Sequence, residues 1–348
     1  MPITLTALTD LADLPFDDLL DVRSPAEFAE DHVPGAMSLP VLSNEERARV
    51  GTIYVQQDRF LARKIGAALV SRNAALHLEG PLADKPGGWR PLVYCWRGGQ
   101  RSGSFASILK EIGWRTDTIK GGYKSYRRLV VHALYEAPVG PRVVLVGGGT
   151  GTAKTRLLAH IAAAGGQIVD LEAMAEHRGS LFGPMGAAQP SQKMFESRLA
   201  MAFAGLDPAR PVFVEAESSK IGEIIVPPSL WKEMIAAPRY EVKAPLAARA
   251  THLVRSYPDM VADADKLEAV LAKLVRYHGH ETVDAWRALA AAGDYARLAA
   301  ELVTAHYDPK YTRISREGAP TPMALDLPDL EDATLAEVAA RMVAEHDG

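Results

Sequence analysis

The stretch VVLVGGGTGTAKTR, residues 143–156, constrains the fold more than any other part of the sequence. An apolar run rich in valine leads into a glycine-rich turn, and Lys154 and Thr155 then open a segment with helical spacing. This order of strand, glycine turn and helix is the layout of a phosphate-binding loop, whose backbone amides surround phosphates at a helix N-terminus. The predicted phosphate-binding residues are Gly148, Gly149, Thr150, Gly151, Thr152, Ala153, Lys154 and Thr155.

The expected roles within this loop follow from the residue types. Backbone amides of residues 149–154 would surround a diphosphate, the Lys154 ammonium would contact its terminal oxygens, and the Thr155 hydroxyl would bind a magnesium ion where one is present. Ala153 stands where the pattern has its second glycine, and an alanine hinders the loop only if a positive φ is required there. Phosphate binding is therefore predicted, and nucleotide hydrolysis is left open.

No metal site is predicted, although four carboxylates follow apolar runs. Each is a candidate for holding a metal ion and is equally compatible with a helix cap or a solvated side chain. They are Asp170, Glu172, Glu215 and Glu217.

The segment YCWRGGQRSG, residues 94–103, contains the one cysteine of the chain, so no internal disulfide can form. A strand end, the nearby Arg97 and Arg101 and a helix starting near Ser102 are expected to lower the pKa of the Cys95 thiol. The adjacent glycines would let backbone amides face an anionic sulfur. A buried cysteine that merely packs is the alternative. The flanking arginines and glycines favour a reactive thiol, with Cys95, Arg97 and Arg101 as catalytic candidates.

Strands that alternate with helices predict an α/β fold with parallel sheets in both halves. The segment EAPVGPR, residues 136–142, carries two prolines and a glycine and marks a domain boundary. Four stretches after residue 245 have helical spacing. The predicted organisation is an N-terminal parallel-sheet domain over 1–136, a phosphate-loop α/β domain over 137–244 and a mainly helical subdomain over 245–348.

Composition narrows the functional classes. The net charge of −4 argues against binding along a whole nucleic-acid backbone, but it allows a local basic patch. No apolar run approaches the roughly 20 residues of a membrane span. The N-terminus lacks a secretory signal. We therefore expect a cytoplasmic protein without a membrane partner.

Residues 21–41, DVRSPAEFAEDHVPGAMSLPV, resemble the N-terminal signature of rhodaneses, and Cys95 matches their catalytic position. The resemblance covers roughly residues 1–130. It implies that Cys95 carries a chalcogen atom, that Arg97 or Arg101 stabilises its charge, and that Asp21, Arg23 and His32 mainly shape the site. Arg101 follows Cys95 with five residues between them, where many single-domain rhodaneses have four, which implies a larger or different acceptor.

The order of both motifs, together with IKGGYKSYRR, VDLEAMAEHRGSLFG and VFVEAESSKIGEIIVP, closely resembles the tRNA 2-selenouridine synthase family. That resemblance implies a P-loop NTPase-like second domain and a transferase that acts on 2-thiouridine at the wobble position of tRNA. Geranyl diphosphate and selenophosphate would be co-substrates, with S-geranyl-2-thiouridine as the intermediate. A selenophosphate-producing enzyme would be the supplier, and Cys95 would receive or deliver selenium.

Basic and aromatic residues supply candidates for contact with RNA. The basic candidates are Lys120, Lys124, Arg127, Arg128, Arg239, Arg249, Arg255 and Arg276. The aromatic candidates are Trp96, Tyr123 and Tyr126, although a core position in the rhodanese-like fold is the favoured interpretation of the two tyrosines. His278 and His280 lack a third metal ligand at suitable spacing, which favours a structural role.

Two other functions remain open from the sequence. A small-molecule kinase fused to a sulfurtransferase would turn over ATP without RNA. A nonenzymatic persulfide carrier would hand sulfur from Cys95 to a partner and would not need Lys154.

Overall fold

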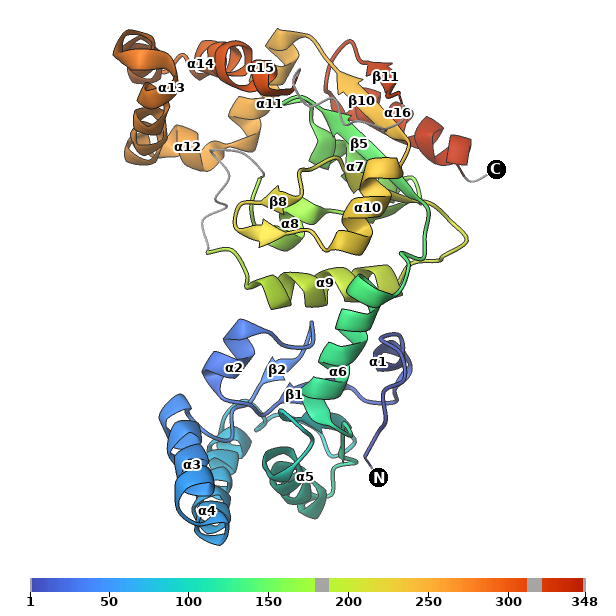
Figure 1. The fold of residues 1–348 in the computed structure, drawn as a ribbon, viewed down its shortest axis with the longest axis vertical. Helices are drawn as coiled ribbons and strands as arrows, with labels where there is room; N and C mark the ends of the chain where they lie inside the picture. Colours follow the sequence, from blue (N-terminus) through green and yellow to red (C-terminus); the bar gives the residue numbers. More distant parts are fainter. Residues whose placement is uncertain (1, 179–187, 312–320, 347–348) are drawn as a thin grey trace. The chain divides into compact units, whose positions relative to one another are not determined.

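The structure is a computed structural model that describes residues 2–178, 188–311 and 321–346 (Figure 1). The chain forms two compact units, of which the first comprises residues 1–138 and 190–205. The second comprises residues 139–189 and 206–348. Helix α9, Gln192–Ala204, therefore belongs to the first unit, although its sequence lies inside the segment 137–244. Its Glu196 accepts hydrogen bonds from Arg127 on α6 (Gly122–Val131) and from Tyr135 on the π-helix η1 (His132–Glu136), which fixes α9 against these two helices.

The first unit is built on a four-stranded parallel sheet in the order β2-β1-β3-β4. Its strands are β1 (Asp18–Asp21), β2 (Met37–Ser38), β3 (Pro91–Tyr94) and β4 (Asp117–Thr118). Its helices are α1 (Asp10–Asp13), α2 (Pro25–Glu30), α3 (Asn44–Gln56), α4 (Arg59–Glu79), α5 (Gln100–Ile112), α6 (Gly122–Val131) and the π-helix η1 (His132–Glu136), together with α9. All four residues of β3 are buried, which suits a central parallel strand covered on both faces.

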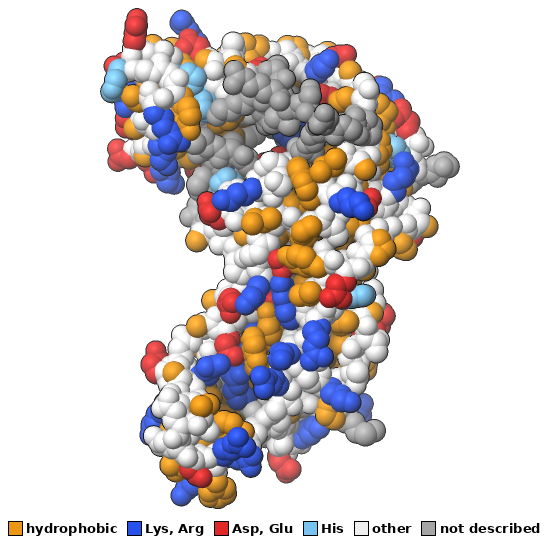
Figure 2. Space-filling view, in the orientation of Figure 1, with side chains coloured by type: hydrophobic (Ala, Val, Ile, Leu, Met, Phe, Trp, Pro, Cys, Tyr) orange, Lys and Arg blue, Asp and Glu red, His pale blue; other side chains and the backbone are white. Residues whose placement is uncertain are grey.

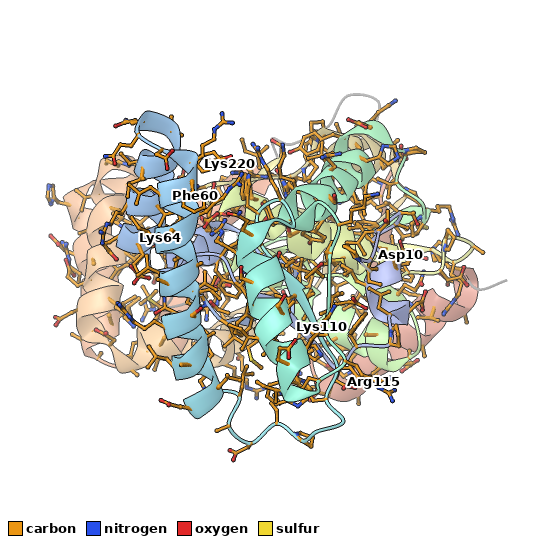
Figure 3. All side chains as sticks on the ribbon, turned by 90° about the horizontal axis from the view of Figure 1, so that it is seen from below. Asp10, Phe60, Lys64, Lys110, Arg115 and Lys220 are labelled. Carbon is orange, nitrogen blue, oxygen red and sulfur yellow. The ribbon has the colours of Figure 1, made fainter. Side chains whose placement is uncertain are left out.

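The long insertion before the cysteine folds as two helices, α3 and α4. Ser43 caps α3 through the Glu46 amide, and Asp58 caps α4 through the Leu61 amide. Phe60 at the start of α4 remains 73% exposed. Figure 3 shows Phe60 and Lys64 on α4, with Lys110 on the neighbouring α5.

The second unit contains a five-stranded parallel sheet in the order β11-β10-β5-β7-β6. Its strands are β5 (Val143–Gly148), β6 (Gln167–Val169), β7 (Val212–Glu215), β10 (Arg239–Lys243) and β11 (Met323–Asp326), and β8 (Lys220–Ile221) and β9 (Ile224–Ile225) form a separate hairpin. Helices α7 (Lys154–Ala163), α8 (Leu171–Ala175), α10 (Pro228–Ala236) and α16 (Asp332–His346) accompany the sheet. The chain order reverses around β5, and the crevice beyond the carboxyl end of such a strand is where open α/β sheets bind ligands.

The C-terminal third is helical up to residue 311 and then returns to the sheet. Its helices are α11 (Leu246–Ser256), α12 (Pro258–Ala262), α13 (Ala264–Ala291), α14 (Tyr295–Leu302), the π-helix η2 (Val303–Tyr307) and α15 (Asp308–Tyr311). Strand β11 then adds an edge to the five-stranded sheet, and α16 packs on α7 over the same core. Leu335 and Met342 of α16 are fully buried, so this helix carries one apolar face. Within the described residues, none of the helices combines the length and apolarity that a bilayer crossing requires.

Candidate functional site

Cys95 lies immediately after β3 and before α5, where the chain leaves the carboxyl edge of the first sheet. The thiol is buried, and its Sγ lies 3.2 Å from Oγ of Ser102 in the first turn of α5. The Ser102 hydroxyl also donates to the Gly99 carbonyl at 3.2 Å. One hydroxyl proton can serve only one acceptor, so a thiol donates to Ser102, whereas an anionic sulfur accepts from it. The first amides of α5 lack intrahelical acceptors and add donors at the same end of the helix.

The two arginines beside the thiol have different environments. Arg97 is exposed in the loop. Arg101 forms a bidentate ion pair with Glu27, with nitrogen–oxygen distances of 2.7 and 3.2 Å. Burial alone would raise the pKa of Glu27, but the hydrogen bonds and charge of Arg101 outweigh it and lower this pKa to about 2. Glu27 is therefore ionised, and its negative charge lies against the Arg101 guanidinium.

The backbone of the Cys95 loop rests directly on the N-terminus of α6. The Tyr123 amide donates to the Cys95 carbonyl at 2.8 Å, and the Lys124 amide donates to the Trp96 carbonyl at 3.1 Å. Gly122 has φ +55°, and a Cβ atom there would lie 2.1 Å from the Cys95 carbonyl oxygen. The glycines of KGGY thus give the cysteine loop its close backbone contact.

The rhodanese-signature residues form a buried frame below the loop. Asp21 and Arg23 are both buried and pair at 2.6 Å. The Arg23 guanidinium also lies over the Tyr123 ring, 4.0 Å from its centroid. His32 stacks on Phe28 at 3.7 Å and binds the Phe28 carbonyl through Nδ1 at 2.8 Å. These contacts position the loop, and none of them reaches the Cys95 sulfur.

Gly149 to Ala153 form the phosphate-binding loop between β5 and α7. Lys154 Nζ donates to the Gly148 carbonyl at 3.2 Å, and the Thr155 hydroxyl donates to Glu215 at 2.8 Å. Ala153 has φ 60° and ψ 31°, which is the left-handed conformation. The loop therefore requires a positive φ where the sequence supplies alanine, a strain that costs about 1–2 kcal/mol.

The four acidic candidates meet behind the loop, at the ends of β6 and β7. Asp170 caps α8 by accepting from the Ala173 amide at 2.8 Å. Burial, reinforced by neighbouring carboxylates, raises the pKa of Glu172 to about 9 and that of Glu215 to about 8. Lys154 opposes both shifts. Within the described residues, no three His, Cys, Asp or Glu side chains are arranged around one point to hold a metal ion.

Helix α11 braces the phosphate-binding loop. Arg249 donates to the Thr150 carbonyl through Nε at 3.0 Å and through Nη2 at 2.8 Å, and its Nη2 pairs with Asp308 at 2.6 Å. Gly151 has φ +81°, and a Cβ atom there would lie 2.9 Å from Cγ of Leu253. Arg249, predicted as an RNA contact, is thus engaged with the loop itself.

The remaining RNA candidates divide into exposed and engaged residues. Lys120 and Arg128 are exposed on the first unit, where Figure 2 shows many lysine and arginine side chains on one face. Arg127 pairs with Glu196, Arg239 with Glu241 and Arg255 with Glu331. Arg276 is exposed and contacts the Tyr277 hydroxyl at 2.5 Å, and Lys124 is half-buried.

The aromatic candidates and His278 have structural environments, whereas His280 is exposed. Tyr123 and Tyr126 are buried in the first unit, as the core interpretation has it, and Trp96 stacks on Tyr123 at 5.2 Å. His278 binds the buried His306 through a ring-to-ring contact of 2.8 Å. This pair and the adjacent Trp286 belong to the packing of the helical segment.

Sequence reasoning missed three contributors to these sites. The sequence predicts Ser102 only as the approximate start of a helix, although its place in the first turn of that helix puts it beside Cys95. Glu27 lies in the rhodanese signature, but nothing in its spacing points to Arg101, 74 residues away. The bracing role of Arg249 depends on a long-range contact that has no local signal.

The fold and its two loops define a rhodanese-like domain joined to a phosphate-loop domain of the AAA class. The model of the rhodanese-like domain matches residues 4–129, and that of the tRNA 2-selenouridine synthase AAA domain matches residues 141–323.

Curated relatives named tRNA 2-selenouridine synthase match the chain across both domains. The Nitrosomonas europaea protein is 37% identical over 73% of this chain and 66% of its own length. The Bdellovibrio bacteriovorus protein is 36% identical over 69% and 64%, and the Aeromonas salmonicida protein is 36% identical over 74% and 68%. The chain thus spans slightly less than two thirds of two of these relatives. It belongs to the tRNA 2-selenouridine synthase family.

Proposed function

We propose that the protein is a tRNA-modifying transferase that converts wobble-position 2-thiouridine into 2-selenouridine through an S-geranyl-2-thiouridine intermediate. Geranyl diphosphate and selenophosphate are its co-substrates. The observation that carries the proposal is the presence, on one chain of this family, of a buried thiol loop and a phosphate-binding loop. Neither loop alone would favour this reaction over sulfur transfer or phosphorylation.

The first step is an alkylation at the phosphate-binding loop. The sulfur of 2-thiouridine attacks the first carbon of the geranyl chain, and the bond from that carbon to the diphosphate oxygen breaks. The bonding electrons leave with the diphosphate, whose growing negative charge is stabilised by the loop amides and Lys154. The Thr155 hydroxyl, which lies 2.8 Å from Glu215, is an oxygen donor that suits a magnesium ion bound with a diphosphate.

The second step is a substitution at the nucleobase. Alkylation turns the sulfur into a thiolate leaving group, so a selenium nucleophile can add to C2 of the base and expel geranylthiol. We assign Cys95 to the delivery of selenium: its loop would hold selenophosphate while the selenium atom attacks C2, and water then cleaves the selenium–phosphorus bond and releases phosphate. The Ser102 hydroxyl, 3.2 Å from the Cys95 sulfur, and the first amides of α5 supply hydrogen-bond donors for this anion. A selenophosphate-producing enzyme supplies the selenium, and the tRNA substrate places the reaction in the cytoplasm.

Mass spectrometry of nucleosides tests this proposal. Full-length protein would be incubated with 2-thiouridine tRNA, geranyl diphosphate and selenophosphate, in wild-type form and as Cys95→Ala and Lys154→Ala. We expect selenouridine only with the wild type, geranylthio-uridine with Cys95→Ala, and unchanged thiouridine with Lys154→Ala.

Two outcomes would replace the proposal with another function. Unmodified tRNA together with RNA-independent ATP turnover would favour the kinase fused to a sulfurtransferase. Persulfide transfer from Cys95 that is insensitive to Lys154→Ala would favour the persulfide carrier.

A further inference from the structure

An apolar cavity of about 80 Å³ lies in the second unit beside the phosphate-binding loop. Thr150 of the loop forms one wall, and the remaining wall residues come from α11 to α14 and η2. They include Leu253 on α11, Met260 on α12, Leu267 on α13 and Ala299 on α14. The cavity is therefore shared between the loop predicted to bind phosphate and a helical layer for which the proposed chemistry has no role.

The cavity and the loop are connected through α11. Leu253 faces the cavity and also packs on Gly151, where an added Cβ atom would meet Leu253 Cγ at 2.9 Å. One turn earlier on α11, Arg249 holds the Thr150 carbonyl through two hydrogen bonds of 3.0 and 2.8 Å. A ligand that filled the cavity would thus contact a helix that is fixed to the loop at two points.

The chemistry of the walls selects an apolar occupant. The lining is almost entirely carbon, with hydroxyl groups only on one threonine and three tyrosines. A nucleobase placed there would bury ring nitrogens and exocyclic groups without enough partners, which weakens binding. A hydrocarbon gives up no hydrogen bonds when it leaves water, and each carbon that it buries increases its affinity.

The size of the cavity suits a short chain. At about 10–15 Å³ for each water-sized group, it seats about five to eight non-hydrogen groups. A ten-carbon isoprenoid whose first carbon stays at the diphosphate would place most of its remaining carbons there. An unfilled apolar cavity lowers stability, and a ligand beside the phosphate loop would offset that loss.

We propose that this cavity binds the isoprenoid chain of the diphosphate substrate and thereby sets its chain length. The inference rests on the proposed function, because the occupant is the geranyl chain whose diphosphate binds at residues 149–154. It assigns Leu253, Met260, Leu267 and Ala299 to substrate selection. The helical segment is then the specificity element of the prenylation step.

Equilibrium binding to the full-length protein tests the proposal without any substitution. Isothermal titration with geranyl diphosphate, dimethylallyl diphosphate and inorganic pyrophosphate compares ten carbons, five carbons and none. We expect geranyl diphosphate to bind at least about tenfold more tightly than dimethylallyl diphosphate, and pyrophosphate to bind most weakly. Binding of all three should weaken in Lys154→Ala.

A cavity-filling substitution locates the effect. Ala299→Phe should weaken geranyl diphosphate binding by about tenfold and leave pyrophosphate binding within about twofold. Ala296→Phe, at an exposed position of the same helix, is the matched control and should change neither affinity. Val261→Phe fills the cavity from α12 and serves as a second variant if Ala299→Phe does not fold.

The outcomes separate this inference from the proposed function. Equal affinity for geranyl diphosphate and pyrophosphate, both dependent on Lys154, would overturn the cavity assignment and leave the diphosphate site standing. Equal weakening of both ligands by Ala299→Phe would also overturn it, because the effect would then act on the loop. Binding of neither ligand to wild-type protein would overturn the diphosphate site and the cavity assignment together.

Discussion

The Cys95 loop and the phosphate-binding loop share one backbone plan and differ in their charge environment. Each joins the end of a buried parallel strand to the start of a helix, β3 to α5 and β5 to α7. Beside Cys95, Arg101 lowers the pKa of Glu27 to about 2, so this carboxyl is ionised. Behind Lys154, burial and mutual repulsion raise the pKa values of Glu172 to about 9 and Glu215 to about 8. The same connection of strand to helix thus places the Cys95 thiol next to a neutral ion pair and the Lys154 ammonium next to carboxyls that keep their protons.

The loops also use their backbone differently. The cysteine loop needs glycine at Gly122, since a Cβ atom there would lie 2.1 Å from the Cys95 carbonyl oxygen. The phosphate-binding loop tolerates Ala153 in a left-handed conformation that glycine would adopt without strain. Close contact between two backbone segments restricts which residues the cysteine loop can accept. In the phosphate-binding loop, local backbone strain sets this restriction.

The largest expected effect is on the cysteine loop. Gly122→Ala should lower the free energy of unfolding by about 3 kcal/mol, because the added methyl combines a positive φ with overlap on the Cys95 carbonyl. Urea denaturation measures the change. Gly103→Ala on α5, where a Cβ atom meets open space, is the control and should not destabilise the protein. Equal stability of the two variants would contradict the close backbone contact.

The next effect concerns the carboxylates behind the phosphate-binding loop. Because the pKa of Glu172 is raised from 4.5 to about 9, the folded state holds a proton that the unfolded chain releases over this range. This contribution to stability is complete below about pH 4.5 and is lost as pH rises toward 9. Glu172→Gln should therefore change little at pH 4 and raise the free energy of unfolding by about 1–2 kcal/mol at pH 8.

Denaturant titrations at several pH values check this prediction. Glu337→Gln, at an exposed position on α16, is the matched control and should show no such pH dependence. A gain from Glu172→Gln that is the same at pH 4 and pH 8 would show that the carboxyl does not retain its proton on folding.

A smaller effect is expected at Ala153. Ala153→Gly removes the strain of a left-handed alanine but increases the freedom of the unfolded chain, so the net gain in unfolding free energy should be about 0.5 kcal/mol. Thermal or urea unfolding measures it. A loss of stability would mean that the alanine side chain contributes more by packing than its backbone loses by strain.

The smallest effect concerns the contact of 3.2 Å between Ser102 and the thiol. Ser102→Ala removes one hydrogen-bond partner of the sulfur and should slow alkylation of Cys95 by iodoacetamide about twofold. Ser107→Ala on the same helix, where the hydroxyl donates to the Gly103 carbonyl instead, is the control. Equal rates for both variants would remove Ser102 from the thiol site.

The parts of the molecule that can be predicted from the sequence are those that local motifs specify. The strand, glycine turn and helix at 143–156 specify the phosphate-binding loop, and the strand before Cys95 specifies the thiol loop. The two-domain α/β plan follows from the alternation of strands and helices, and comparison with the family confirms it. Each of these features depends on residues close together in sequence.

The features that escaped prediction depend on distant residues. Strand β11 and α16 lie in the segment 245–348, which is predicted as a mainly helical subdomain, but Leu325 and Leu335 return the chain to the sheet. Helix α9 joins the first unit through Glu196 and Arg127. The positive φ of Ala153 is also not predicted, because the sequence of the loop does not fix its backbone dihedral angles.

The measurement that tests the central claim most directly separates the two steps by supplying the intermediate. Purified tRNA containing S-geranyl-2-thiouridine would be incubated with selenophosphate and either Lys154→Ala or Cys95→Ala protein, and its nucleosides would be analysed by mass spectrometry. We predict that Lys154→Ala protein forms selenouridine from this tRNA and that Cys95→Ala protein leaves it geranylated. Failure of Lys154→Ala protein, or formation of selenouridine by Cys95→Ala protein, would contradict the assignment of one step to each loop.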